Sequence, residues 1–79
     1  MTTKALGDNL RKMYFRENVN KVTMILLFGI KYAEEIRAAA SNSSMNSVVK
    51  EIVDHAKVPS SYAIEIKKAV ALADYVDLK

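Results

Sequence analysis

The sequence contains no cysteine, one proline and two glycines among its 79 residues. Without cysteine, the chain can form neither a disulfide bond nor a zinc site with thiolate ligands. So few glycines and prolines argue against a fold that needs many tight turns. A domain of this size must therefore be stabilised by good helix packing, by self-association, or by both.

The chain also has no long hydrophobic run. Its longest apolar stretch, Met24 to Ile30 with lysines on both sides, is far shorter than the roughly 20 apolar residues of a membrane span. The amino terminus lacks the apolar segment of a secretory signal. We therefore expect a cytoplasmic protein that does not contact a membrane. The net charge of +3 is compatible with a polyanionic partner but does not require one.

Residues for catalysis or metal binding are scarce. His55 is the only histidine, and the adjacent Asp54 would point away from it on a helix. The carboxylates have no metal-ligand spacing, and no serine lies in the glycine-framed turn of a nucleophile elbow. We expect no enzyme activity, no metal or other cofactor, and no small-molecule substrate.

Apolar residues recur at helical spacing along most of the chain, and the composition favours helix formers. Thr2 or Thr3 could cap the first helix, and Asn18 to Asn20 is typical of a break. Gly29 lies on the apolar stripe of the second helix, which predicts the close approach of a neighbouring helix. Residues 75–78 alternate in polarity and fit either a frayed helix end or a short extended edge strand. We predict one compact all-α domain of four helices, at about 3–17, 21–40, 46–57 and 60–74.

The carboxyl-terminal half has the pattern of a helix-turn-helix, in which the second helix can enter a DNA major groove. Pro59 restricts the preceding residue to extended geometry, which suits a sharp corner between two helices. Two positions depart from the usual pattern. Lys57 stands where a glycine usually relieves a left-handed turn, at a cost of about 1 kcal/mol, and Val53 replaces a small alanine. The apolar positions at the expected spacing are Ile52, Ala56, Val58, Ala63 and Ile66.

If the last helix reads DNA, its serines can bond base edges or phosphates and its lysines can hold phosphates. The nucleic-acid-binding candidates are Lys57, Ser60, Ser61, Ile64, Glu65, Lys67 and Lys68. Residues 1–39 carry seven basic and four acidic side chains, whereas residues 40–79 carry five of each. Because residues 40–79 contain the helix that would read DNA and carry no excess positive charge, we expect a monomer to bind DNA weakly. A dimer could bind duplex DNA more tightly by combining two weak half-sites. The additional candidates for phosphate contact are Arg11, Lys12, Arg16 and Lys21.

A protein–protein interaction module without DNA binding is the alternative function. The first half of the predicted helix at 21–40 is apolar nearly all round, which exceeds what a small monomer comfortably buries. The candidates for such an interface, with a second copy or another protein, are Met24, Leu27, Phe28 and Tyr32.

Two sequence strings resemble a group of small bacterial proteins described as helix-turn-helix-like. They are LFGIKYAEEI at residues 27–36 and PSSYAIEIKK at residues 59–68. The resemblance covers roughly residues 10–76. It implies a compact helical fold and a nucleic-acid or regulatory role, with no catalytic residues to carry over.

Overall fold

The computed structural model of the chain describes residues 1–76. This part contains five α-helices and one short 3-10 helix, and no strand occurs within it. The all-α prediction is therefore confirmed, with five α-helices in place of the predicted four. The helices are α1 (Thr3–Tyr14), α2 (Lys21–Lys31), α3 (Ala33–Ala40), α4 (Met45–Ala56), α5 (Tyr62–Leu72) and the 3-10 helix η1 (Ala73–Tyr75).

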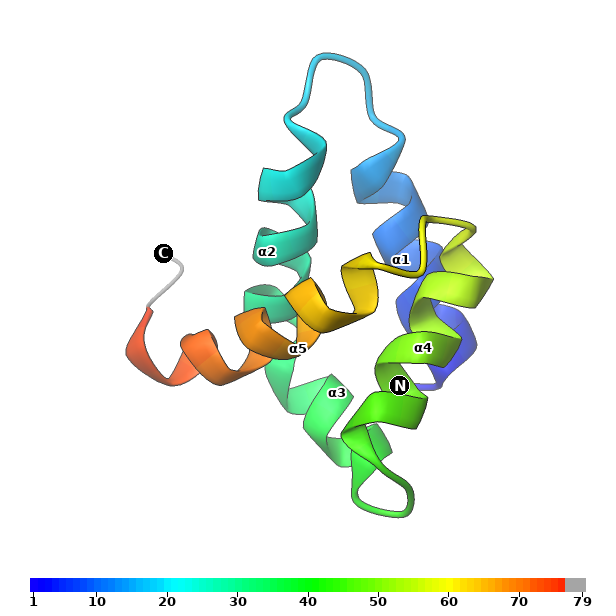
Figure 1. Cartoon of the computed structure of the whole chain (residues 1–79), viewed down its shortest axis with the longest axis vertical. Helices are drawn as coiled ribbons and strands as arrows, with labels where there is room; N and C mark the ends of the chain where they lie inside the picture. Colours follow the sequence, from blue (N-terminus) through cyan, green and yellow to red (C-terminus); the bar gives the residue numbers. More distant parts are fainter. Residues whose placement is uncertain (77–79) are drawn as a thin grey trace.

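The additional helix arises because the predicted helix at 21–40 is interrupted at one residue. Tyr32, with φ −106° and ψ 21°, ends α2 and precedes α3. Its amide N–H still donates to the Phe28 carbonyl at 3.0 Å, and its carbonyl accepts from the Ile36 amide at 2.9 Å. The chain therefore changes direction without losing these hydrogen bonds, and α3 reaches α4 (Figure 1). Sequence periodicity cannot reveal such a single-residue departure.

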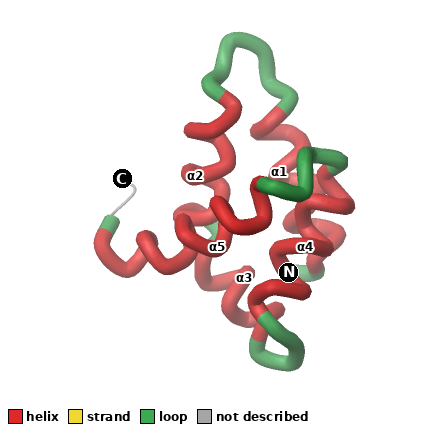
Figure 2. The backbone as a smooth tube through the Cα atoms, in the orientation of Figure 1, coloured by secondary structure: helices red, strands yellow, loops and turns green. Residues whose placement is uncertain are grey.

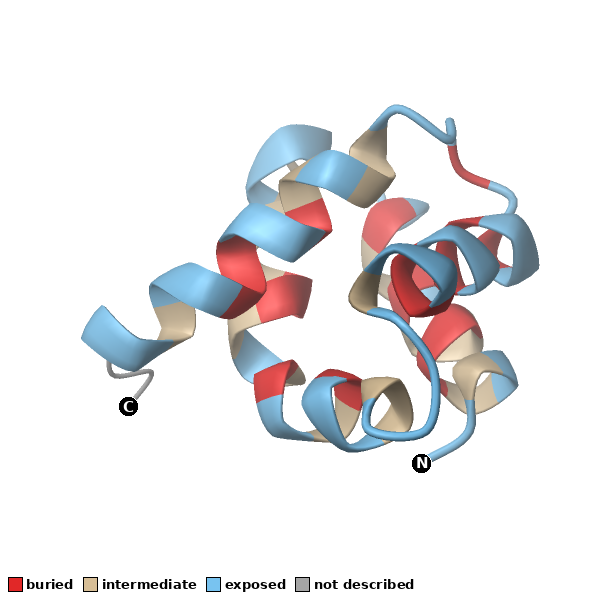
Figure 3. Ribbon diagram, turned by 60° about the horizontal axis from the view of Figure 1, so that its bottom comes forward, coloured by how far each residue is buried: buried red, intermediate tan, exposed pale blue. Residues whose placement is uncertain are grey.

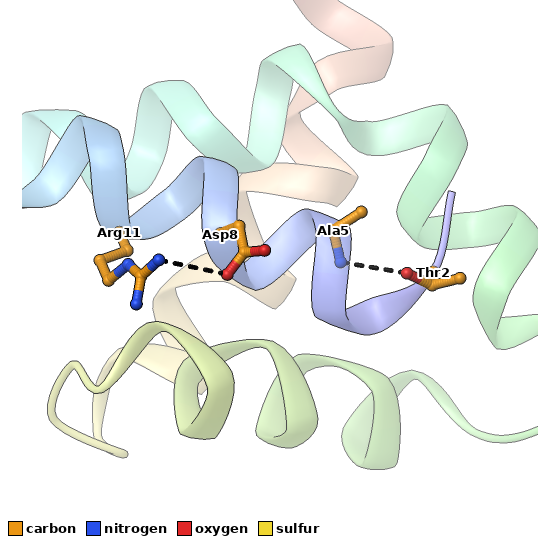
Figure 4. A network of polar contacts seen from close by, with 4 residues as sticks. All are labelled: Thr2, Ala5, Asp8 and Arg11. Atoms are coloured by element: carbon orange, nitrogen blue, oxygen red, sulfur yellow. Dashed lines mark hydrogen bonds and ion pairs between the residues drawn. The ribbon is translucent and has the colours of Figure 1, made fainter.

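Capping side chains determine where α1 and α2 begin. The Thr2 hydroxyl accepts a hydrogen bond from the Ala5 amide at 3.1 Å, as Figure 4 shows. Helix α1 ends at Tyr14, earlier than predicted, and Asn18 then adopts a left-handed conformation with φ 60°. The Asn20 side chain accepts from the third residue of α2 at 2.9 Å. The predicted break at Asn18 to Asn20 is therefore confirmed. Asparagine suits both positions, because it tolerates the left-handed conformation of Asn18 and is a favourable N-cap at Asn20.

The two glycines mark the most extensive helix contacts, α1 with α4 and α2 with α5. A Cβ atom on Gly7 would lie 2.5 Å from Cβ of His55 on α4. A Cβ atom on Gly29 would lie 2.5 Å from Cβ of Ala69 on α5. The predicted close approach at Gly29 is therefore confirmed. Because neither glycine has a side chain, the backbones of the two helices can pack closely at each position.

All five α-helices contribute to one hydrophobic core. Figure 3 shows the buried positions on the sides of the helices that face one another. Val22, the second residue of α2, is about half exposed. The largest fully buried side chains are Leu6, Leu10, Ile25, Phe28, Ile36, Val48, Ile52, Val53 and Ile66.

The carboxyl end continues as helix through Tyr75, after which Val76 has extended dihedral angles. This observation supports the frayed-helix alternative as far as Tyr75. Asp77 and Leu78, the rest of the segment predicted as helix end or edge strand, lie outside the described residues. Within residues 1–76, no helix has the length and apolar character to cross a membrane.

Candidate nucleic-acid interface

The corner between α4 and α5 is a Schellman motif with lysine at the left-handed position. Lys57 has φ 60° and ψ 38°. Its amide donates to the Asp54 carbonyl at 3.3 Å, and the Val58 amide donates to the Val53 carbonyl at 3.2 Å. These two bonds satisfy the last carbonyls of α4, and the side chain of Val58 is buried in the core. The corner forms where the sequence pattern places it, although no glycine occupies its strained position.

Helix α5 leaves this corner across α4, not alongside it, as the ribbon and the tube show (Figures 1 and 2). The Tyr62 amide donates to the Pro59 carbonyl and the Ala63 amide to the Ser60 carbonyl, both at 3.1 Å. These turns lead the chain from the corner into α5. Its inner face is held by Ile66, Ala69 and Val70, all of them buried.

Two side chains from other helices anchor α5 at its ends. At its start, the ring of Tyr62 makes an edge-on contact with that of Tyr14, with centroids 5.7 Å apart. At its end, Arg37 of α3 donates to the Val70 carbonyl at 2.9 Å and forms an ion pair with Asp74 at 3.1 Å. Both ends of α5 are thus fixed before any ligand binds.

Most residues predicted to contact nucleic acid share the outer face of α5 or the corner before it. Ile64 is 62% exposed, whereas Glu65 is half buried and lies 3.8 Å from the Lys68 ammonium. This exposed ion pair partly offsets the charge of Lys68 but adds little stability. The exposed members of the predicted set are Lys57, Ser60, Ser61, Ile64, Lys67 and Lys68.

A groove of about 330 Å³ separates the first turns of α4 from the first turns of α5. Apolar side chains form part of its lining, and a lysine from each helix flanks them. No acidic side chain lines it among the described residues. This α4–α5 groove is lined by Asn46, Val49, Lys50, Ser60, Ala63, Ile64 and Lys67.

Two polar residues of this groove, Asn46 and Lys50, were missing from the predicted nucleic-acid-binding set. The Lys67 ammonium donates to the Asn46 side-chain oxygen at 2.9 Å, which joins α5 to the start of α4. The four-residue spacing of Asn46 and Lys50 places both on one helical face. Only the crossing of the helices brings that face to α5. The groove therefore contains lysines that are distant in the sequence and no acidic side chain among the described residues. Its local charge is positive, although residues 40–79 as a whole carry equal numbers of basic and acidic side chains.

Two of the four predicted phosphate contacts on α1, α2 and the loop between them interact instead with groups of the protein. The Lys21 ammonium donates to the Tyr14 carbonyl at 2.6 Å and lies 4.5 Å from the centroid of the Tyr14 ring. Lys21 thus caps the carboxyl end of α1. Arg11 lies 3.5 Å from Asp8, the contact drawn in Figure 4. Lys12 and Arg16 are exposed.

Of the two aromatic residues beside these cations, Tyr14 belongs to the core and Phe15 does not. Tyr14 is buried, and burial raises the pKa of its phenol above 10.0, with a hydrogen bond to Tyr62 and the charge of Tyr62 raising it further. Phe15, whose ring centroid is 5.0 Å from that of Tyr14, is 54% exposed. The contact with Tyr62 brings the end of α1 close to the start of α5.

The predicted protein–protein interface needs one correction. Phe28 is fully buried in the core, 5.2 Å from the Tyr32 ring, so it cannot contact a partner on the surface. Because this helix is apolar nearly all round, the sequence pattern could not show which of its apolar residues the core covers. Met24, Leu27 and Tyr32 are half buried. The exposed large apolar residues are Met1, Phe15, Val22, Ile64, Leu72, Tyr75 and Val76.

The α4–α5 groove offers hydroxyl, amide and ammonium groups beside apolar surface. Such groups can bind anions and polar base edges. Within the part of the chain that the structure describes, no three histidine or acidic side chains lie close enough together to hold a metal ion.

Comparison with models of known protein families gives a match over nearly the whole chain. A family model described as an HTH-like domain matches residues 2–79. A search of curated proteins and a search of solved structures each find no significant match.

Proposed function

The chain belongs to the family of HTH-like domains, and we propose that it binds double-stranded DNA by placing the opening turns of α5 in the major groove. The observation that carries this proposal is the exposed start of α5 beside a groove with lysines on both sides. In helix-turn-helix proteins, the second helix contacts base edges with its first residues. Ser60, Ser61 and Ile64 hold those positions here.

Phosphate contacts would come from both helices of the motif. Lys50 and Lys67 flank the α4–α5 groove, Lys57 is exposed at the corner, and Lys68 is exposed on α5. Lysines in such positions attract the DNA backbone and hold the reading helix in register, without selecting a sequence. Lys12 and Arg16, close in sequence to the anchored end of α1, could extend the contact. We propose a regulatory or accessory role in the bacterial cytoplasm, where the DNA lies.

A fluorescently labelled duplex of mixed sequence tests this proposal by anisotropy at increasing salt concentrations. Four lysine–phosphate contacts predict a slope of about −3.6 for the logarithm of affinity against that of salt. Lys67→Glu with Lys68→Glu should abolish binding. Lys4→Glu with Lys31→Glu makes the same change in net charge outside the groove and should largely preserve it. Failure of the wild type to bind at low salt, or equal losses in both variants, would refute the proposal.

Self-association is a second candidate function, with or without DNA binding. Leu72 at the end of α5, Tyr75 at the end of η1 and Val76 after it are exposed, and Tyr75 is 87% exposed. A dimer formed there would carry two reading helices for two half-sites. Light scattering tests this candidate, since Tyr75→Asp should reduce the mass at high concentration whereas Lys67→Glu should not. An unchanging monomer mass would exclude it.

A further inference from the structure

Ile64 stands out among the exposed residues of the proposed reading surface. The other exposed members of that surface are serines and lysines, which bind phosphates or polar base edges. Ile64 is 62% exposed on the first turn of α5, and it lies outside the core. The side chain of Ile64 neither packs in the core nor can bind a phosphate. Neither role therefore explains why a large apolar residue occupies this exposed position.

The surroundings of Ile64 define what could cover it. Ala63 of α5 lines the same groove and extends the apolar surface, with Ser60 beside it, whereas Val49 of α4, which also lines the groove, is almost fully buried. Lys50 and Lys67 flank this surface from the two helices, and no carboxylate lines the groove. The matching ligand has a small apolar group between anionic groups.

Duplex DNA presents that combination at one base. Thymine carries a C5-methyl group on its major-groove edge, the only methyl group among the four standard bases, between two rows of phosphates. The geometry points to Ile64 as the residue that recognises a thymine methyl group, with Lys50 and Lys67 on the flanking phosphates. This inference rests on the proposed DNA binding and adds a preference for duplexes with a methyl group in the major groove. An acidic peptide would also match the charges of the groove. If such a peptide were the ligand, the protein would show no preference for methylated over unmethylated duplexes.

The test compares duplexes that differ only in this methyl group. One pair alternates adenine with thymine or with deoxyuridine, and the other alternates guanine with cytosine or with 5-methylcytosine. The wild-type protein should bind the methylated member of each pair about fourfold more tightly for each buried methyl group. Ile64→Ala should bind both members equally. Because Ile64 is outside the core, this variant should retain the wild-type circular dichroism spectrum and unfolding midpoint.

Val22→Ala is the matched control, because Val22 is also an exposed, branched apolar residue but lies on α2 and does not line the groove. This variant should keep the methyl preference. Equal wild-type binding to both members of each pair would overturn the inference while leaving the proposed DNA binding intact. A preference that persists in Ile64→Ala would likewise overturn it. Absence of binding to every duplex at low salt would instead refute the proposed function.

Discussion

Gly29 of α2 lies directly against Ala69 of α5. A methyl group on Gly29 would be 2.5 Å from Cβ of Ala69 and 3.0 Å from the carbonyl oxygen of Ile66. Neither neighbour can move aside by rotating a flexible side chain, because one is a Cβ atom and the other is backbone. The position of the proposed reading helix therefore depends on a residue without a side chain on a different helix.

Gly29→Ala should destabilise the fold, although alanine is the better helix former. The helix preference favours alanine by about 1 kcal/mol, but overpacking costs about 1–3 kcal/mol. We expect a net loss of about 1 kcal/mol in the free energy of unfolding, measured with urea. Adding Ala69→Gly should recover part of this loss relative to the sum of the single changes. A more stable Gly29→Ala variant would contradict the close packing of α2 and α5.

Lys57→Gly should stabilise the fold, because Lys57 has a left-handed backbone conformation. Glycine relieves that strain, while its greater freedom in the unfolded chain reduces the gain. We expect the free energy of unfolding to rise by about 0.5–1 kcal/mol. Lys50→Gly, an exposed position inside α4, should lower it by about 1 kcal/mol. If both variants lost stability equally, the corner would not have the described conformation.

Phe28→Ala should cost about 3–5 kcal/mol of stability, as expected for a buried aromatic residue. Phe15→Ala provides the control, since that ring is about half exposed. Its cost should be at most about 1 kcal/mol. Thermal unfolding followed by circular dichroism distinguishes the two variants. Similar small shifts for both would place Phe28 on the surface and restore it as an interface candidate.

The fold should lose stability at alkaline pH because of Tyr14. Burial raises the pKa of its phenol above 10.0, so the folded state favours the neutral form. The corresponding stability is fully present below pH 10 and is lost as the pH rises through the folded-state pKa. Tyr14→Phe should therefore show a smaller alkaline loss in urea unfolding than the wild type. Tyr75→Phe, at an exposed tyrosine, should lose as much as the wild type, and equal losses in all three proteins would contradict the assignment.

Local signals in the sequence were sufficient to predict the helical fold and the corner. Apolar periodicity, the capping residues Thr2 and Asn20, and the Pro59 break each act within a few residues. Tertiary relationships were not predictable in this way. The burial of Phe28 depends on how the other helices pack against α2, and the presence of Lys50 and Lys67 in one groove depends on how α4 and α5 cross. The candidate site was therefore predicted on α5 but missed on α4.

Backbone amide shifts of the isotope-labelled protein, recorded by NMR while duplex DNA is added at low salt, would locate the DNA-binding surface residue by residue. We expect the largest perturbations on residues 57–68 and on Asn46 and Lys50, with α3 unaffected. Perturbations concentrated around Arg11, Lys12 and Arg16, or no perturbation at any residue, would contradict the assignment of the α4–α5 groove as the DNA-binding surface.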